Sequence, residues 1–117
     1  MTSIPPSEYI IFLRPEPADG AVRREVVGIG RDRGERPLPT DPIYLPDIGF
    51  AKIYCAADLN FDAEFCEELF ALWTMCTEYR RTGDCDSEGY SEFLRRFGPA
   101  CERADAIAHA ALTATTH

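Results

Sequence analysis

The sequence predicts an α+β fold: a small antiparallel sheet of three to four strands, packed on one face by two to three C-terminal helices. Two observations predict it. Residues 8–57 contain short β-branched and aromatic runs separated by proline and glycine, and residues 62–113 repeat apolar side chains at spacings of three and four. The 117 residues, 45% hydrophobic and 27% charged, suit one ordinary folded domain spanning residues 1–117.

The first half of the chain contains the predicted strands, which are rich in Val, Ile, Tyr and Phe and end at turn-forming residues. The neighbouring Val26 and Val27 interrupt the alternation of the second strand, which predicts a bulge or burial on both faces. The short apolar triplet at residues 43–45, between Pro42 and Pro46, predicts an edge strand, where proline is tolerated. The four segments are 9–13, 22–29, 43–45 and 48–57.

Residues 30–42 form a long polar stretch without core periodicity, which predicts an exposed loop. Its Arg31, Arg33 and Arg36 could grip a phosphate or a carboxylate, and they are the candidate anion-binding site of an alternative function. The glycines at 28, 30 and 34 suggest a phosphate-binding loop. The prolines that follow deny that loop the helix it requires, so we assign the glycines to a bulge and a turn.

The pattern changes to a helical one after residue 62. Apolar residues from Phe65 to Tyr79 step by four and three, which is one stripe of an amphipathic helix. Asp62 is the expected N-cap and Gly83 the expected residue after the last turn.

A second helical pattern covers residues 87–113, interrupted by Gly98-Pro99. We expect a kinked or broken pair of helices, 87–97 and 99–113, because proline favours the first turn of a new helix. The residues expected at the centre of the core are Phe65, Leu69, Trp73, Phe93, Leu94 and Phe97.

No group of residues predicts a reaction centre. The five cysteines contain no Cys-x-x-Cys pair, and no secretory segment is visible, so we expect reduced thiols and a cytoplasmic protein. Cys85, between two aspartates, is expected to be exposed. Asp105 and His109 are four residues apart on a helix, which most simply gives a surface pair. We therefore predict no enzyme activity, no cofactor and no metal site.

Charge is the clearest functional signal. The net charge is −8, and residues 53–117, with twelve acids and five bases, contribute −7 of it. Such a surface repels nucleic acid, attracts basic proteins and argues against direct nucleic-acid binding. The candidate partner-binding residues are Glu64, Glu67, Glu68, Glu78, Asp84, Asp86 and Glu88.

These observations lead to one main functional hypothesis. The chain is a small acidic, non-enzymatic binding protein that occludes the basic surface of a nucleic-acid-handling protein. Inhibitors from phages or mobile elements, such as anti-CRISPR proteins, are the compositional analogy. The alternatives are an anion- or nucleic-acid-binding module using the arginine loop, a small-molecule enzyme with a pocket between sheet and helices, and a subunit of a homo-oligomer. No membrane span is expected, because no apolar run approaches ~20 residues.

Overall fold

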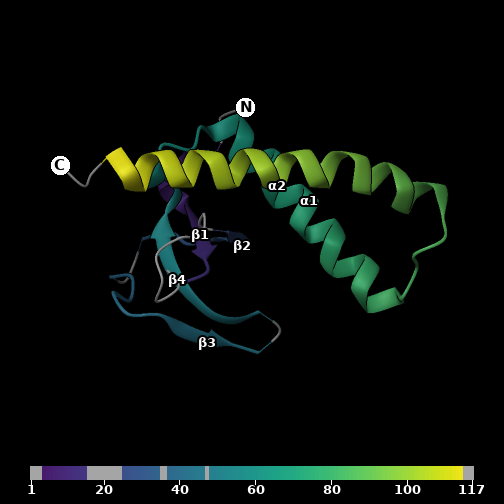
Figure 1. Cartoon of the computed structure of the whole chain (residues 1–117), viewed down its shortest axis with the longest axis horizontal. Helices are drawn as coiled ribbons and strands as arrows, with labels where there is room; N and C mark the ends of the chain where they lie inside the picture. The colour runs from purple at the N-terminus through teal and green to yellow at the C-terminus, as the bar shows by residue number, and fades with distance from the viewer. Residues whose placement is uncertain (1–3, 16–24, 35–36, 47, 115–117) are drawn as a thin grey trace.

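The computed structural model describes residues 4–15, 25–34, 37–46 and 48–114. It confirms the α+β prediction: a four-stranded antiparallel sheet packs against two long helices (Figure 1). A turn of 3₁₀ helix, η1 (Pro6–Glu8), precedes the first strand, and a second, η2 (Ala56–Leu59), follows the last. The strands are β1 (Tyr9–Leu13), β2 (Val26–Arg31), β3 (Ile43–Leu45) and β4 (Gly49–Cys55), in the order β2-β1-β4-β3. The helices are α1 (Ala63–Thr82) and α2 (Glu88–Ala114).

Strand β2 contains the predicted bulge. Phe12 pairs with Gly28 and Leu13 with Val26, so Val27 is an extra residue in the ladder. Both valines are buried, which explains why the apolar alternation fails there. The strand continues to Arg31, so the prediction that it ends at residue 29 and that the loop begins at residue 30 was wrong. The predicted start of this strand, residues 22–24, lies outside the described residues.

The two faces of the sheet are filled differently. Tyr9, Ile11 and Leu13 alternate along β1 and are buried in the main core. On the opposite face, Phe12 lies over Gly28, where a Cβ would be only 3.0 Å from a ring carbon of Phe12. Glycine at this position therefore allows the Phe12 ring to lie across the strand, a packing role instead of a phosphate-binding one.

Helix α1 begins and ends as predicted. The Asp62 Oδ1 accepts a hydrogen bond of 2.7 Å from the Phe65 N–H, which satisfies a free donor of the first turn. At the other end Gly83 has φ of 72°, a left-handed conformation, and its N–H donates to the Tyr79 carbonyl.

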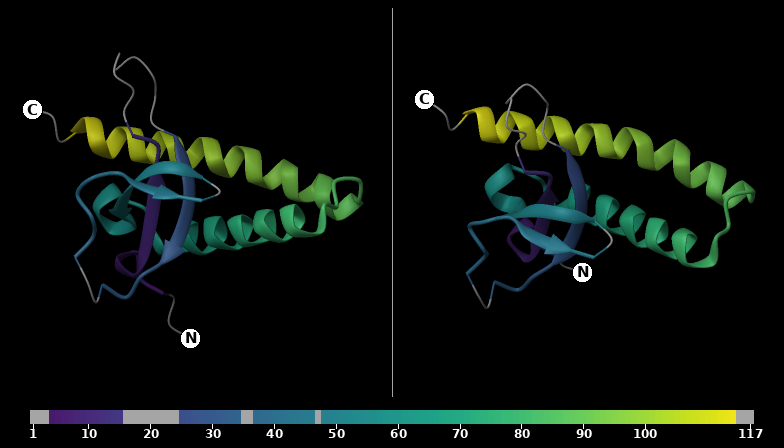
Figure 2. Two further views of the ribbon diagram at one scale, coloured as in Figure 1. Left: turned by 90° about the horizontal axis from the view of Figure 1, so that it is seen from below. Right: turned by 60° about the horizontal axis from the view of Figure 1, so that its bottom comes forward.

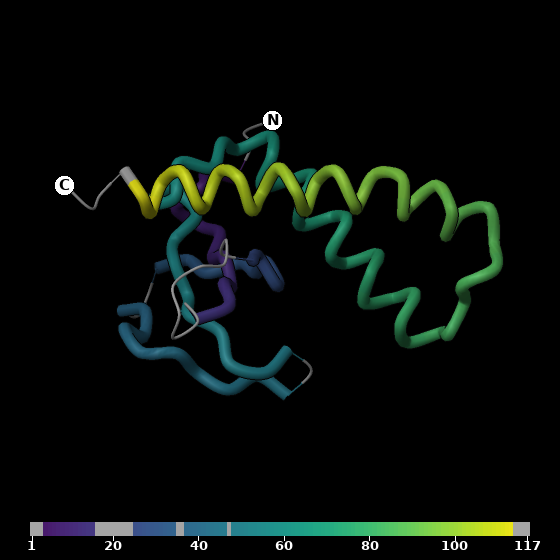
Figure 3. The backbone as a smooth tube through the Cα atoms, viewed as in Figure 1, coloured from purple at the N-terminus to yellow at the C-terminus, as the bar shows by residue number. Residues whose placement is uncertain are grey.

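Helix α2 corrects the prediction of two separate helices. It is continuous from Glu88 to Ala114, with Pro99 inside it (Figure 3). Pro99 has no N–H to donate to the Arg95 carbonyl, and because Gly98 and Pro99 are both exposed, water can hydrate that carbonyl instead. The buried residues on both sides of Pro99 share one face of the helix, and their packing holds the two halves in line.

The helices cross one face of the sheet and continue past it as a projecting hairpin, diverging toward the turn that connects them (Figures 1 and 2). We call residues 73–97, the half nearest this turn, the helical arm. Phe65, Leu69 and Phe93 are buried in the core as predicted, and Trp73 and Phe97 are partly buried against it. Leu94 is 46% exposed, so its assignment to the core was wrong. It lies on the arm, where no strand of the described sheet reaches it.

Candidate functional site

The seven predicted acidic residues all lie on the surface of the helical hairpin, and each is exposed. Four lie on α1 within about 100° of arc, at 100° per residue, opposite its buried stripe. Two lie in the connection between the helices, and Glu88 begins α2. We call this set the acidic face; it comprises Glu64, Glu67, Glu68, Glu78, Asp84, Asp86 and Glu88.

The acidic face is extended instead of concentrated. Glu64 and Glu78 are fourteen positions apart, about 21 Å along the helix axis. Glu78 forms an ion pair with Arg81, whose hydrogen bond and charge lower the pKa of the Glu78 carboxyl. Asp84 also has a local role, because its Oδ1 accepts hydrogen bonds from the N–H groups of Asp86 (3.3 Å) and Ser87 (3.2 Å) and so closes the turn. Glu64, Glu67, Glu68, Asp86 and Glu88 are the members left without such a local contact to described residues.

The arginine-rich segment of the alternative hypothesis is arranged differently from the prediction. Arg31 belongs to β2 instead of a loop. Its guanidinium is 3.8 Å from the Glu8 carboxylate and 5.7 Å from the centre of the Tyr9 ring. Arg33 is exposed, and Arg36 lies outside the described residues. Arg31 thus has a structural partner and contributes less to a free anion site than the sequence suggests.

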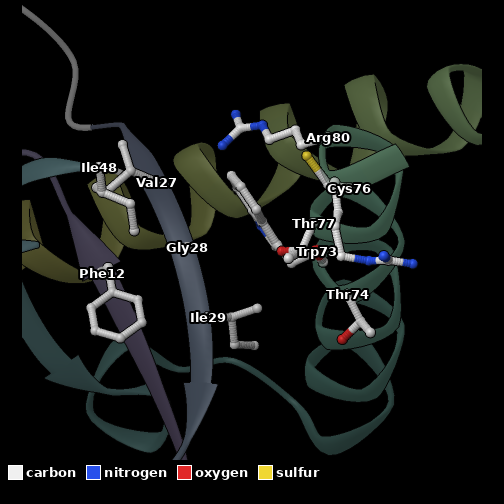
Figure 4. Close-up of a pocket in the computed structure, with 11 residues that line it drawn as sticks. Phe12, Val27, Gly28, Ile29, Ile48, Trp73, Thr74, Cys76, Thr77 and Arg80 are labelled. Carbon is white, nitrogen blue, oxygen red and sulfur yellow. Dashed lines mark hydrogen bonds between the residues drawn. The ribbon is translucent and has the colours of Figure 1, made fainter. Parts of the chain in front are cut away.

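The sequence suggested a pocket between sheet and helices only as an alternative and predicted no residues for it; the structure has a groove along the outer edge of β2. Two adjoining pockets, with volumes of about 640 and 240 Å³, share Val27, Ile48, Trp73 and Arg80. We call them together the β2 groove. Its floor is the edge of β2, and its far wall is α1, from which Trp73 and Arg80 extend toward the strand (Figure 4).

The Trp73 indole is the largest side chain in the groove. It packs edge-on against Phe97 of α2, with ring centroids 4.9 Å apart. Its Nε1 is buried and has no hydrogen-bond partner among the described residues. A buried donor without an acceptor costs about 1–3 kcal/mol. The indole is therefore held in place by packing and not by a hydrogen bond.

The two ends of the β2 groove differ in charge. The only charged residues that line the larger pocket are Arg80 and Arg81. The smaller pocket is mixed in charge, with the shared Arg80, Arg14, Glu25 and Asp105. Arg14 donates to the Ile48 carbonyl, and the Asp105 Oδ1 accepts from the Val26 N–H at 2.7 Å. Asp105, which the sequence suggested was a surface partner of His109, therefore ties α2 to β2.

Cys76 and Cys101 both line the groove, and Cys101 is a weak nucleophile. Burial, with a further contribution from the Asp105 charge, raises the pKa of Cys101 to about 11. Burial and the nearby Asp62 likewise raise the pKa of Cys66 to about 11. Because the thiolate is the reactive form, both are protonated at neutral pH. Cys85 is exposed, as predicted.

Within the described ranges, no group of three or more Cys, His, Asp or Glu side chains could hold a metal ion. The described helices also lack a stretch long and apolar enough to cross a membrane. Comparisons with family models, curated proteins and solved structures found no match to this chain.

Proposed function

We propose that this protein is a non-enzymatic binding protein that places its acidic face on the basic surface of a nucleic-acid-handling protein in the cytoplasm and blocks that surface. The observation that carries the proposal is the exposure of all seven predicted carboxylates along the helical hairpin, four of them on the arm that projects past the sheet. A projecting arm can enter a channel that a flat surface could not, as an inhibitor of the phage or mobile-element type would require.

Electrostatics supports this direction of binding. The chain has a net charge of −8, and six of the seven carboxylates form no ion pair with the residues that the structure describes. Unpaired surface charges of one sign speed association with an oppositely charged partner and disfavour like-charged ones. The same carboxylates would compete with the phosphates of a nucleic acid for the partner's basic residues.

The test is capture from the native cell lysate with the immobilised protein at low and high salt. We compare the wild type with Glu64→Lys/Glu67→Lys/Glu68→Lys. The matched control is Asp58→Lys/Glu92→Lys/Glu102→Lys, which reverses three exposed charges outside the acidic face. The proposal expects a nucleic-acid-binding protein that is captured by the wild type and the control, released at high salt, and lost by the acidic-face variant.

A captured protein must then lose its nucleic acid when the wild type is added, measured by fluorescence anisotropy of a labelled oligonucleotide. Retention of the same partner by a folded acidic-face variant, with an unchanged circular dichroism spectrum, would contradict the proposal. So would a complex of this protein, its partner and the nucleic acid bound together.

A further inference from the structure

We propose that the β2 groove is a second binding site, which takes an extended acidic segment of a partner protein as an additional strand beside β2. Strand addition of this kind uses backbone hydrogen bonds for affinity and side-chain pockets for selection. The site differs from the acidic face because it lies on the flank of α1 that is turned toward the sheet, and the two adjoin only at the ion pair between Arg81 and Glu78.

The first support is the free edge of β2. The strand order places β2 outermost, and no described strand pairs with its other side. The Asp32 N–H donates to the Glu8 carbonyl at 2.9 Å, which fixes the alternation of the ladder with β1. Gly28 and Gly30 accordingly direct their backbone groups toward β1, and Ile29 and Arg31 direct theirs outward, available to a new strand.

The second support is that the helices extend further than the sheet they cover. Along one line of α1, at steps of seven residues, Cys66 is fully buried, Trp73 is half-buried and Arg80 is exposed. On α2, Leu94 and Asp105 lie on the same line of the helix. Asp105 contacts β2, but Leu94 is 46% exposed. One further strand beside β2 would cover the flank that these residues leave open.

The third support is charge, which selects the partner's chemistry. In a chain of net charge −8, the charged side chains lining the larger pocket are two arginines. Arg81 is paired with Glu78, but Arg80 is exposed and forms no ion pair with described residues. A guanidinium beside an apolar wall suits a carboxylate side chain that follows an apolar one on the same face of an extended peptide.

A synthetic peptide tests the proposal directly. The probe is acetyl-Ser-Val-Thr-Glu-Thr-Val-Ser-amide, whose apolar and acidic side chains share one face in either orientation. Trp73 is the only tryptophan in the chain, so its emission reports on the groove. Labelled-peptide anisotropy gives the affinity independently. We expect binding of the Glu peptide, about fivefold or more weaker binding of a Gln version, and no binding of a Lys version in the groove.

Three protein variants locate the peptide. Arg80→Glu should weaken binding of the Glu peptide about tenfold or more, and Arg96→Glu, an equal charge change at an exposed position outside the groove, should not. Glu64→Lys/Glu67→Lys/Glu68→Lys should bind this peptide at least as well as the wild type. That variant separates this site from the proposed function, because loss of one activity then leaves the other measurable.

Modified peptides test strand addition without any risk to the fold of the protein. Methylating alternate backbone nitrogens in the peptide should abolish binding for one alternating set and spare the other, since only one set faces β2. Equal binding of both methylated sets would overturn the proposal. So would equal affinity for the Glu and Lys peptides in the groove, or no change in anisotropy or Trp73 emission at about 1 mM Glu peptide. A concentration-dependent dimer that itself shifts Trp73 emission would assign the groove to a second copy and also overturn it.

Discussion

The two halves of the helical hairpin are packed by opposite means. Where the hairpin lies on the sheet, α2 presents small residues, and we call this half the helical seat (residues 63–72 and 98–114). Its buried α2 residues are Ala100, Ala104, Ala108 and Ala111. Small side chains let a helix approach its neighbours closely, so the seat is a tight joint between helices and sheet.

The helical arm is filled by aromatic rings instead. Tyr79 of α1 packs against Tyr90 and Phe93 of α2, with centroids 5.1 and 5.2 Å apart. Phe93 stacks on Phe97 at 4.9 Å, and Trp73 meets Phe97 at 4.9 Å. Large rings fill the widening space between the diverging helices, so the arm is stabilised by contacts between its own helices.

This difference explains why the arm can present two flanks for binding. The seat must use its inner flank for the core, but the arm needs only the surface between its helices. Its outer flank carries Glu78, Asp84, Asp86 and Glu88 of the acidic face, and its inner flank continues into the β2 groove with Arg80 at the rim. A chain with a strongly negative total charge therefore also carries two arginines, Arg80 and Arg81, on the flank of the same helix beside the acidic one.

The largest expected effect is a difference in the free energy of unfolding between variants of two neighbouring residues of the arm. Phe93→Ala should lower the free energy of unfolding by about 3–5 kcal/mol, because Phe93 is 2% exposed and holds the aromatic cluster together. Leu94→Ala should change it by less than about 1 kcal/mol, because Leu94 is 46% exposed. Urea denaturation measures both. Similar losses for the two variants would show that Leu94 is covered in solution, and the contrast between the flanks would fail.

A smaller effect tests the tightness of the seat. Ala104 is fully buried, so Ala104→Leu should cost about 1–3 kcal/mol by overpacking. The control is Gly98→Ala on the same helix, where a Cβ meets no atom within 4 Å. This change should stabilise by about 0.5–1 kcal/mol, because alanine is the better helix former. Thermal unfolding of both variants gives the comparison, and a neutral Ala104→Leu would mean that the seat is looser than described.

The last prediction concerns the reactivity of the thiols, which also distinguishes the two halves and leaves stability aside. At about pH 8, iodoacetamide should modify the exposed Cys85 at the tip of the arm at least about 100-fold faster than Cys66 or Cys101 in the seat. Their pKa values of about 11 keep them protonated, so their rates should rise about tenfold for each pH unit up to that value. Mass spectrometry of the labelled peptides measures the rates. Rapid labelling of Cys101 at pH 8 would show that the end of the groove opens to solvent.

Much of the fold was predictable because it rests on local signals. The spacing from Phe65 to Tyr79, with Asp62 before it and Gly83 after it, defines α1 almost to the residue. The paired valines of β2 predicted the bulge. In each case neighbouring residues determine the outcome, and no knowledge of distant contacts is needed.

The errors share a non-local cause. Pro99 ends a helix by local rules, but its exposed position and the packing on either side keep α2 continuous. Leu94 has the spacing of a core residue, and its exposure depends on where the sheet stops. The role of Asp105 depends on a hydrogen bond to Val26, 79 positions away in sequence. The residues of the β2 groove could not be predicted for the same reason, since its strand and helix walls meet only in the folded chain.

The turn at the tip of the arm has a consequence for how this protein can diversify. Asp84, Ser87 and Gly83 close it with their own hydrogen bonds and backbone geometry. The turn makes no demand on the sheet. Adding seven residues to each helix, about two turns or 10.5 Å, would keep the helix faces in nearly the same direction. Insertions can therefore lengthen the arm and deletions can shorten it, while the sheet and the seat keep their sequence.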